Sequence, residues 1–166
     1  MLQHPVPDKL LVHIGDITVS FALLELMIQQ LAGTLITDRQ NISQIITAEL
    51  AFKNLRALTI SLYKERYSKN ADFDILKKLM KRAAYIEDKR NQITHSFWCV
   101  GNKQNTIMRA KKTAKEKHGF RFYFEEFSEQ DLAEIAVEIK QLAKDIQNFW
   151  LHLLDPSITI AFHGNT

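Results

Sequence analysis

Apolar residues recur at steps of three and four along residues 132–153, and this spacing restricts the segment to an amphipathic helix. Ser128 and Asp131 precede it in the arrangement of a capping box, in which a hydroxyl and an acidic residue three positions later satisfy the first backbone donors of a helix. Pro156 ends the pattern, because proline disfavours helical geometry in the residue before it. The sequence therefore predicts one long helix, with an apolar face made of Leu132, Ile135, Ala136, Ile139, Leu142, Ala143, Ile146, Phe149, Trp150 and Leu153.

Three earlier segments have the same helical spacing. We expect the first helix to begin at residue 10 or 16 and to end at residue 36, the second to span residues 42–67, and the third to begin near Asp72, with Asp72 as its cap. Short connections join these segments, so adjacent helices should lie antiparallel. The predicted fold is mainly α, an antiparallel up-and-down bundle of four to five helices.

The spacing changes from helical to alternating after Gly101. Residues 106–112 and 120–127 both favour strands, so we expect a β-hairpin, inserted between helices, at about residues 105–127. Between residues 103 and 117 there are six basic residues and one acidic residue, so the hairpin carries the surplus positive charge. Phenylalanine occupies alternate positions of the second strand. We interpret these rings as part of the core in preference to platforms on which RNA bases stack: Phe120, Phe122 and Phe124.

A chain of 166 residues, 46% of them hydrophobic, fits one ordinary domain, and we expect a single domain over residues 1–166. Its one cysteine, Cys99, cannot form an internal disulfide, and the N-terminus has no secretory signal pattern, so the cytoplasm is the expected compartment. The longest apolar stretch, residues 14–36, contains Asp16 and Glu25, which a membrane span would carry at a cost. We therefore interpret this stretch as a core helix and expect no membrane contact.

The end of the third predicted helix carries polar residues at positions where apolar residues should continue the side that faces the core. Arg90 follows the apolar line at helical steps, which places a charge on a line of buried positions. Asn91 and His95 are four residues apart and therefore stack on the neighbouring face. An arginine, an amide and a histidine converge at this helix end. The apolar line that leads to Arg90 consists of Leu76, Leu79, Ala83 and Ile86.

Arg90, four intervening residues and His95, with Asn91 directly after the arginine, resemble the signature of the HEPN family. This family comprises helical domains that are common in bacterial toxin–antitoxin and abortive-infection (phage-defence) systems. The resemblance implies a homodimer that brings two motifs together, a metal-independent RNA endonuclease without a cofactor, and Arg90, Asn91 and His95 as catalytic residues. Phe97 stands where one subgroup carries a tyrosine that a partner nucleotidyltransferase modifies, so we do not expect that mode of control.

RNA can be cleaved without a metal when its 2′-hydroxyl attacks the adjacent phosphate, which requires a proton shuttle and a cation for the developing charge. Histidine moves protons near neutral pH and arginine clamps a phosphate, so we expect His95 to be the shuttle and Arg90 the clamp. Asn91 would hold the imidazole or a phosphate oxygen. Because residues 90 and 95 lie about 140° apart around an ideal helix, either the helix end unwinds or a second protomer completes the site.

Two acidic residues are candidate partners of Arg90 next to the site: Glu25 and Glu87. In the structural interpretation, Arg90 only forms an ion pair with one of them. The basic residues of the hairpin are candidate RNA-binding residues, and these are Arg109, Lys111, Lys112, Lys115 and Lys117.

The alternative function is a non-catalytic helical dimer that binds RNA or a protein partner, such as an antitoxin, and uses the same residues at a subunit interface. The remaining histidines stand at no ligand spacing with Cys99 or with carboxylate pairs, so no metal site is expected. The sequence has no glycine-rich phosphate loop, so no nucleotide cofactor is expected.

Overall fold

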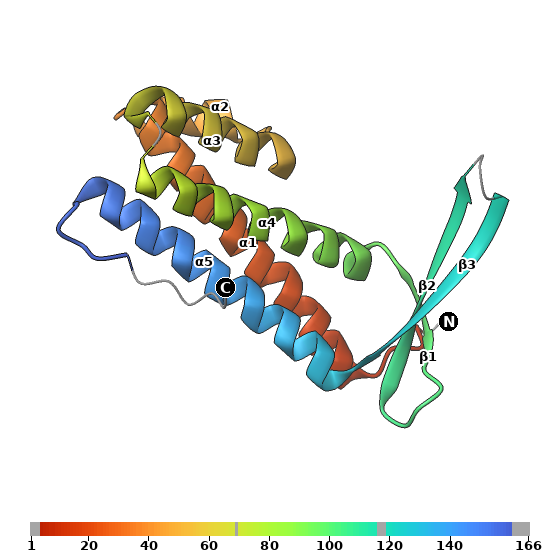
Figure 1. Cartoon of the computed structure of the whole chain (residues 1–166). Coiled ribbons are helices and arrows are strands. Elements are labelled where there is room, and N and C mark those ends of the chain that lie inside the picture. The colour runs from red at the N-terminus through yellow and green to blue at the C-terminus, as the bar shows by residue number, and fades with distance from the viewer. Residues whose placement is uncertain (1–3, 69, 116–118, 161–166) are drawn as a thin grey trace. The chain divides into compact units, whose positions relative to one another are not determined.

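The structure is a computed structural model that describes residues 4–68, 70–115 and 119–160 (Figure 1). Within these ranges the chain forms five helices and three strands. It is therefore mainly α with a small antiparallel sheet, which confirms the predicted class and the inserted hairpin. In chain order the elements are α1 (Asp8–Ile36), α2 (Gln40–Thr47), α3 (Phe52–Tyr67), α4 (Ala71–Thr94), β1 (Phe97–Val100), β2 (Thr106–Lys115), β3 (Gly119–Ser128) and α5 (Glu129–Leu154).

The chain divides into two compact units. The first, which we call the sheet unit, consists of Met1–Val19 and Asp88–Glu138. The second, the helical unit, consists of Ser20–Glu87 and Ile139–Thr166. Helices α1, α4 and α5 each contribute one part to each unit, and the single domain over residues 1–166 stays a prediction.

The core of the helical unit is built from the apolar lines that the helical spacing predicts. On α1 the line from Phe21 to Leu35 is buried, and on α5 the line from Ile139 to Phe149 is buried. An amphipathic helix gains stability by removing such a line from water, which is why these segments pack on their apolar sides. Side chains with no more than 1% exposure include Leu24, Ile28, Leu31, Leu55, Leu76, Met80, Ile86, Ile139, Leu142 and Ile146.

Two contacts establish the relative direction of α3 and α4. Arg56, near the start of α3, donates from Nη2 to Glu87 Oε2 near the end of α4, at 3.0 Å. Tyr63, near the end of α3, stacks on Phe73 near the start of α4, with ring centroids 6.1 Å apart. These two helices are therefore antiparallel, as the short connection predicts.

α1 and α3 run in the same direction, which differs from a strictly alternating bundle. Phe21 of α1 packs on Phe52 at the start of α3, with ring centroids 4.7 Å apart. Arg66, near the end of α3, donates from Nη2 to the carbonyl of Ile36, the last residue of α1, at 3.1 Å. The short α2 between them provides the additional reversal of the chain.

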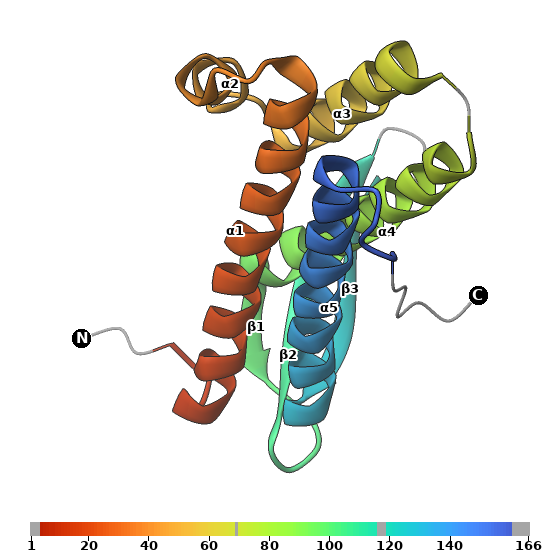
Figure 2. The ribbon, with the colours of Figure 1, turned by 90° about the vertical axis from the view of Figure 1, so that its left-hand side faces the viewer.

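The segment predicted as one helix over residues 42–67 forms two helices, so that prediction is wrong. α2 ends at Thr47, and Ala51 has extended backbone with φ −57° and ψ 144°. α2 lies beside the end of α1, where a Cβ added at Gly33 would be 3.0 Å from Ser43 Oγ (Figure 2). Since residues 48–51 contain neither glycine nor proline, this tertiary packing ends the helix, not a local breaker.

The predicted cap and end of the third helix are both corrected. The cap of α4 is Asn70, whose Oδ1 accepts a hydrogen bond from the backbone N–H of Phe73 at 2.9 Å. Asp72 instead lies in the first turn, 3.6 Å from His152 Nε2 of α5. The sequence predicts residues 87–98 as the last turns of this helix, but α4 ends at Thr94, and residues 97 and 98 begin strand β1.

The capping box of α5 is confirmed. The carboxylate of Asp131 accepts a hydrogen bond from the backbone N–H of Ser128 at 2.7 Å, and the Asp131 N–H donates to Ser128 Oγ at 3.2 Å. The Ser128 hydroxyl and backbone donors favour the ionised carboxylate and hold the pKa of Asp131 below its usual value. This stabilisation is therefore present above the usual pKa of an aspartate and is lost as the pH falls through the lowered pKa.

We expect Ser128→Ala to lower the free energy of unfolding by about 1 kcal/mol, because the cap loses its side-chain acceptor. Urea denaturation followed by circular dichroism measures this change. Gln130→Ala is the matched control, since Gln130 is exposed and bonds only to Glu134 on the surface of α5 among the contacts described. Equal stability of wild type and Ser128→Ala would contradict the capping role.

The three strands form one sheet in the order β1-β2-β3, with both pairs antiparallel. Its inner face carries Trp98, Ile107 and Phe127, and the Trp98 and Phe127 rings meet edge to face at 5.6 Å. The other face, which we call the outer face, leaves Phe120, Phe122 and Phe124 at 61%, 49% and 59% exposure. The prediction that these three rings belong to the core is therefore wrong; other apolar side chains of the sheet fill the inner face.

α1 is long enough and apolar enough, by length and composition alone, to cross a membrane, and 28% of its most apolar 18-residue window is buried. A core helix meets the same criterion, and one line of α1 is indeed core. The opposite side exposes Val19, Leu23 and Leu26 at 70%, 48% and 44%. This outward apolar side is more than a solvated helix needs.

Candidate functional site

A pocket of about 420 Å³ lies in the sheet unit between the end of α4 and strand β2. Its walls are mostly polar, and two of the three charged residues are basic. The lining residues are Asp88, Asn91, Gln92, His95, Ser96, Arg109 and Lys111. The pocket thus combines residues from two parts of the sequence that were singled out for different reasons.

The α4 side of the pocket is formed by the last two turns of the helix and the two residues after it, His95 and Ser96. Asn91 and His95 lie four positions apart, and the His95 N–H donates to the Asn91 carbonyl at 3.1 Å. Ser96 Oγ bonds to the Gln92 carbonyl, which closes the same turn. These bonds order the backbone that carries the exposed His95 and the half-buried Asn91.

The β2 side presents two basic residues at alternate positions, so both lie on the inner face of the sheet. Arg109 is 8% exposed, whereas Lys111 is exposed. Arg109 Nη2 contacts Glu125 Oε2 of β3 at 2.5 Å, and Nη1 donates to the Gln92 carbonyl of α4 at 3.4 Å. The guanidinium is therefore fixed between the neighbouring strand and the helix end.

Arg109 keeps one donor unsatisfied. Its Nε is buried and has no hydrogen-bond partner among the described residues. A buried donor without a partner costs about 1–3 kcal/mol, so the surrounding structure must hold this side chain in place. A nearly buried arginine that forms one wall of an open polar pocket can supply positive charge to an anion there.

β1 fixes the geometry of this corner. Trp98 Nε1 donates to the carbonyl of Ile93 at 3.1 Å, which ties the strand to the last turn of α4. In the sheet register Trp98 stands opposite Arg109, and Arg109 stands opposite Glu125. The strand that follows His95 therefore determines which β2 residue faces the helix end.

The predicted catalytic residues are only partly brought together. Asn91 and His95 line the pocket, whereas Arg90 is half-buried and is not among the described residues that line it. The difference follows from helix geometry, because Arg90 lies about 140° from His95. The role of Arg90 as a phosphate clamp stays a prediction, and Arg109 is the arginine beside His95.

The predicted acidic neighbours of Arg90 lie in the helical unit. Glu87 pairs with Arg56, and both side chains are less than 20% exposed. Glu25 is half-buried on α1. Their expected role beside Arg90 stays a prediction.

The predicted RNA-binding residues divide between the two faces of β2. Arg109 and Lys111 line the pocket, whereas Lys112 lies on the outer face with its Nζ 5.6 Å from the centroid of the Phe122 ring. Lys115 is the last residue of β2, and its side chain lies outside the described part of the structure. Lys117 lies outside the described residues.

Sequence reasoning missed the wall that Asp88, Gln92 and Ser96 contribute, and it treated Arg109 only as part of a basic hairpin. The missed signal is the apolar run of residues 97–100 directly after His95, which is typical of a short strand. A strand there turns the chain back and allows β2 to meet the helix end.

Within the described part of the chain, no three histidine, cysteine, aspartate or glutamate side chains gather as a metal site. No protein-family model, curated protein or solved structure matches this chain. The pocket contains an imidazole that can move protons, His95, and an amide that can orient it, Asn91. It also contains two cations that can hold a phosphate.

Proposed function

We propose that this protein is a HEPN-like, metal-independent RNA endonuclease that cleaves RNA in the pocket formed by α4 and β2. The observation that supports the proposal is that His95 and Asn91 share a pocket with Arg109 and Lys111. The resemblance of the α4 sequence suggests the reaction, and the two basic residues supply the charge that the reaction requires.

In the proposed reaction, the 2′-hydroxyl oxygen forms a bond to the adjacent phosphorus while the bond from phosphorus to the 5′-oxygen breaks. His95 accepts the proton of the 2′-hydroxyl or gives a proton to the leaving 5′-oxygen. Arg109 and Lys111 hold the non-bridging oxygens as negative charge develops. Asn91, one turn before His95, orients the imidazole. The products are a 2′,3′-cyclic phosphate and a 5′-hydroxyl.

One histidine cannot be base and acid in the same step, so the proposal includes a homodimer in which a second chain supplies another motif. Arg90 then acts as the resemblance implies, on the phosphate, or as a positioning residue for the end of α4. The helices are proposed to assemble as a HEPN-like antiparallel bundle, apart from the shared direction of α1 and α3. A cytoplasmic location, a toxin–antitoxin or phage-defence role and an antitoxin partner belong to the same proposal.

The direct test uses the purified full chain, structured and unstructured RNA, and an excess of chelator. We expect RNA fragments that end in a 2′,3′-cyclic phosphate, identified by mass spectrometry. The variants Arg90→Ala and Arg109→Ala then separate the two arginine assignments, provided that circular dichroism confirms folding of each. Absence of cleavage of every RNA by the folded wild-type protein would refute the endonuclease.

A second candidate function, a non-catalytic dimer, is favoured by the unusual orientation of α2. This helix buries Ser43 and Thr47 and exposes Ile42, Ile45 and Ile46 at 41%, 76% and 44%. Isoleucines that point outward from a helix whose polar side is buried fit an apolar partner surface. We propose a second copy of this chain as the partner, bound with or without cleavage.

We expect Ile45→Glu to convert a wild-type dimer into a monomer without loss of folding, because the side chain is 76% exposed and carries no core packing. Light scattering coupled to size-exclusion chromatography measures the mass. Gln44→Glu, on an exposed position of the same helix, is the matched control. A wild-type monomer at micromolar concentration would refute the dimer. A dimer that does not cleave RNA would favour the second candidate over the first.

A further inference from the structure

The outer face of the hairpin is an exposed row of aromatic rings. Phe120, Phe122 and Phe124 stand at alternate positions of β3, so all three side chains leave the sheet on one side. They are 61%, 49% and 59% exposed, although burial of such rings is the usual source of their contribution to stability. The row is therefore available for a ligand.

The rings are arranged as a continuous surface. Phe122 and Phe124 are nearly parallel, with an interplanar angle of 5° and centroids 6.0 Å apart. Phe120 meets Phe122 edge to face at 4.8 Å. Ala110 stands opposite Phe124 in the register, so no large side chain covers that ring from β2. Half-exposed aromatic rings of this kind are what unpaired nucleic-acid bases stack on.

The charge around the row is positive. Lys112 stands opposite Phe122 and places its ammonium 5.6 Å from the ring centroid. Arg121, Arg109 and Lys111 alternate with these positions and belong to the inner face, so Lys112 is the basic side chain beside the rings among the described residues of the outer face. Of the two acidic residues of β3, Glu125 belongs to the inner face, and Glu126 shares the outer face but lies beyond Phe124, opposite Met108 and away from Lys112. A polyanion that approaches the rings meets complementary charge.

We propose that the outer face of the hairpin, formed by Lys112, Phe120, Phe122 and Phe124, binds unpaired bases of RNA. The inference rests on the proposed function in one respect, since it takes RNA to be the ligand. It also specifies that function: the preferred substrate is RNA with an unpaired segment near the phosphate that is cleaved. Duplex RNA cannot offer its base faces to the rings.

The position of Lys112 argues against a second copy of this chain as the occupant of the outer face. Lysine is depleted at the centre of protein interfaces, where a buried ammonium is costly. Here the lysine lies over the middle ring of the row. A cation beside an aromatic platform is, by contrast, the usual combination in proteins that bind single-stranded nucleic acid.

The test measures fluorescence anisotropy of a labelled single-stranded oligouridylate and of a duplex of the same length, with the full chain in the His95→Ala background. We expect tighter binding of the single strand. Phe122→Ala should weaken that binding by roughly 5- to 150-fold, and Phe122→Trp should restore it, because tryptophan keeps a ring for stacking. Tyr85→Leu is the control, since Tyr85 is an aromatic residue of the helical unit with 54% exposure.

Lys112→Gln should reduce the slope of the logarithm of the binding constant against the logarithm of salt concentration by about 1. Equal affinity of wild type and Phe122→Ala for the single strand would overturn the proposal. A change of oligomeric mass in Phe122→Ala, with unchanged RNA affinity, would also overturn the proposal, because it would show that the outer face binds a second copy of the chain. Ring-dependent binding without any cleavage by wild type would refute the endonuclease and leave the platform intact.

Discussion

Replacement of His95 by alanine is expected to lower the rate of RNA cleavage by roughly 10²- to 10⁴-fold, the range that a positioned acid or base contributes. The reason is that His95 is the imidazole of the pocket, one turn beyond Asn91 and across from Arg109. Single-turnover cleavage of a labelled RNA in chelator measures the rate. His4→Ala is the matched control, because His4 is also exposed and lies outside this pocket.

The same assay distinguishes the two arginines. If the cation at the phosphate is Arg109, Arg109→Ala should lose cleavage. Arg109→Lys keeps the charge, but lysine lacks the planar guanidinium that contacts Glu125 and the Gln92 carbonyl at the same time. If the resemblance assigns the clamp correctly, Arg90→Ala produces the larger loss. Wild-type rates in His95→Ala, with folding preserved, would remove histidine catalysis from this pocket and with it the endonuclease mechanism.

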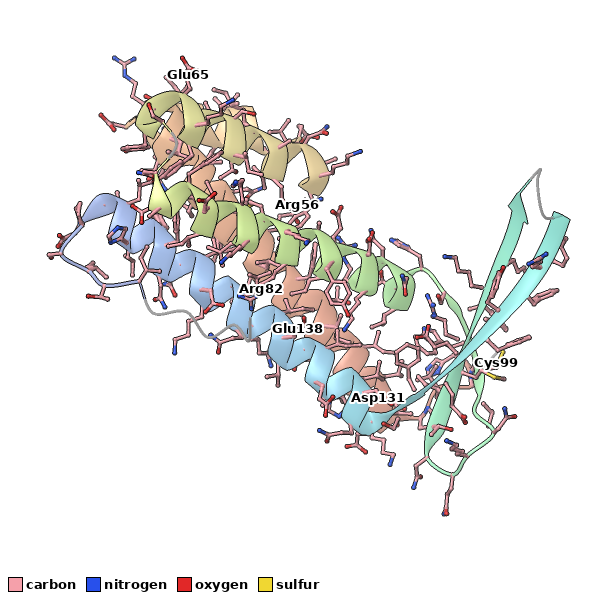
Figure 3. All side chains as sticks on the ribbon, viewed as in Figure 1. Arg56, Glu65, Arg82, Cys99, Asp131 and Glu138 are labelled. Carbon is pink, nitrogen blue, oxygen red and sulfur yellow. The ribbon has the colours of Figure 1, made fainter. Side chains whose placement is uncertain are left out.

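Arg82→Leu is expected to lower the free energy of unfolding by about 3 kcal/mol, because it removes the guanidinium that forms an ion pair with a buried carboxylate. Arg82 of α4 is labelled in Figure 3. Its Nη1 lies 2.6 Å from Oδ2 of Asp145, which is 0% exposed. Gln141 Nε2 donates to Oδ1 of the same carboxylate at 2.9 Å. Urea denaturation of the variant and of wild type measures the difference.

Asp145→Leu should lower the free energy of unfolding by less than Arg82→Leu does. The Arg82 side chain is 31% exposed, so in Asp145→Leu the guanidinium can turn to water. In the double variant Arg82→Leu/Asp145→Leu the buried carboxylate is removed together with the guanidinium, and much of the stability should return. A loss of less than about 1 kcal/mol in Arg82→Leu would indicate that the pair does not stabilise the helical unit.

Much of the helical framework could be predicted from the sequence, because a buried line must repeat at helical spacing wherever the chain forms a long helix. The lines of α1 and α5 and the capping box at Ser128 illustrate this. The break between α2 and α3 could not be predicted, since residues 48–51 contain no helix breaker and the packing of Ser43 near Gly33 decides it.

The pocket was predictable in its parts but not in its assembly. The spacing of Asn91 and His95 is local, so the sequence identifies that wall. Arg109 reaches it only because β1 pairs with β2 in a register that sets Trp98 opposite Arg109. No residue pattern in the sequence encodes that register, because register depends on which face of the sheet is buried.

The prediction that Phe120, Phe122 and Phe124 belong to the core was wrong for a related reason. Aromatic residues occur on both faces of this strand, with Phe122 and Phe124 on one and Tyr123 and Phe127 on the other. Alternation alone cannot identify the buried face when both are aromatic. The tertiary contact of Phe127 with Trp98 decides it.

β3 is an edge strand of the sheet, and an edge strand can pair with another molecule at high protein concentration. In the described chain β3 pairs only with β2, so the backbone N–H and C=O groups along its other side are open to an added strand. Ten residues without proline, five of them aromatic, form a segment prone to amyloid-like stacking. Arg121, Glu125 and Glu126 interrupt this segment with charge. Glu126→Gln, which brings the net charge of the segment to zero and leaves the Arg109–Glu125 pair in place, should therefore promote fibre formation.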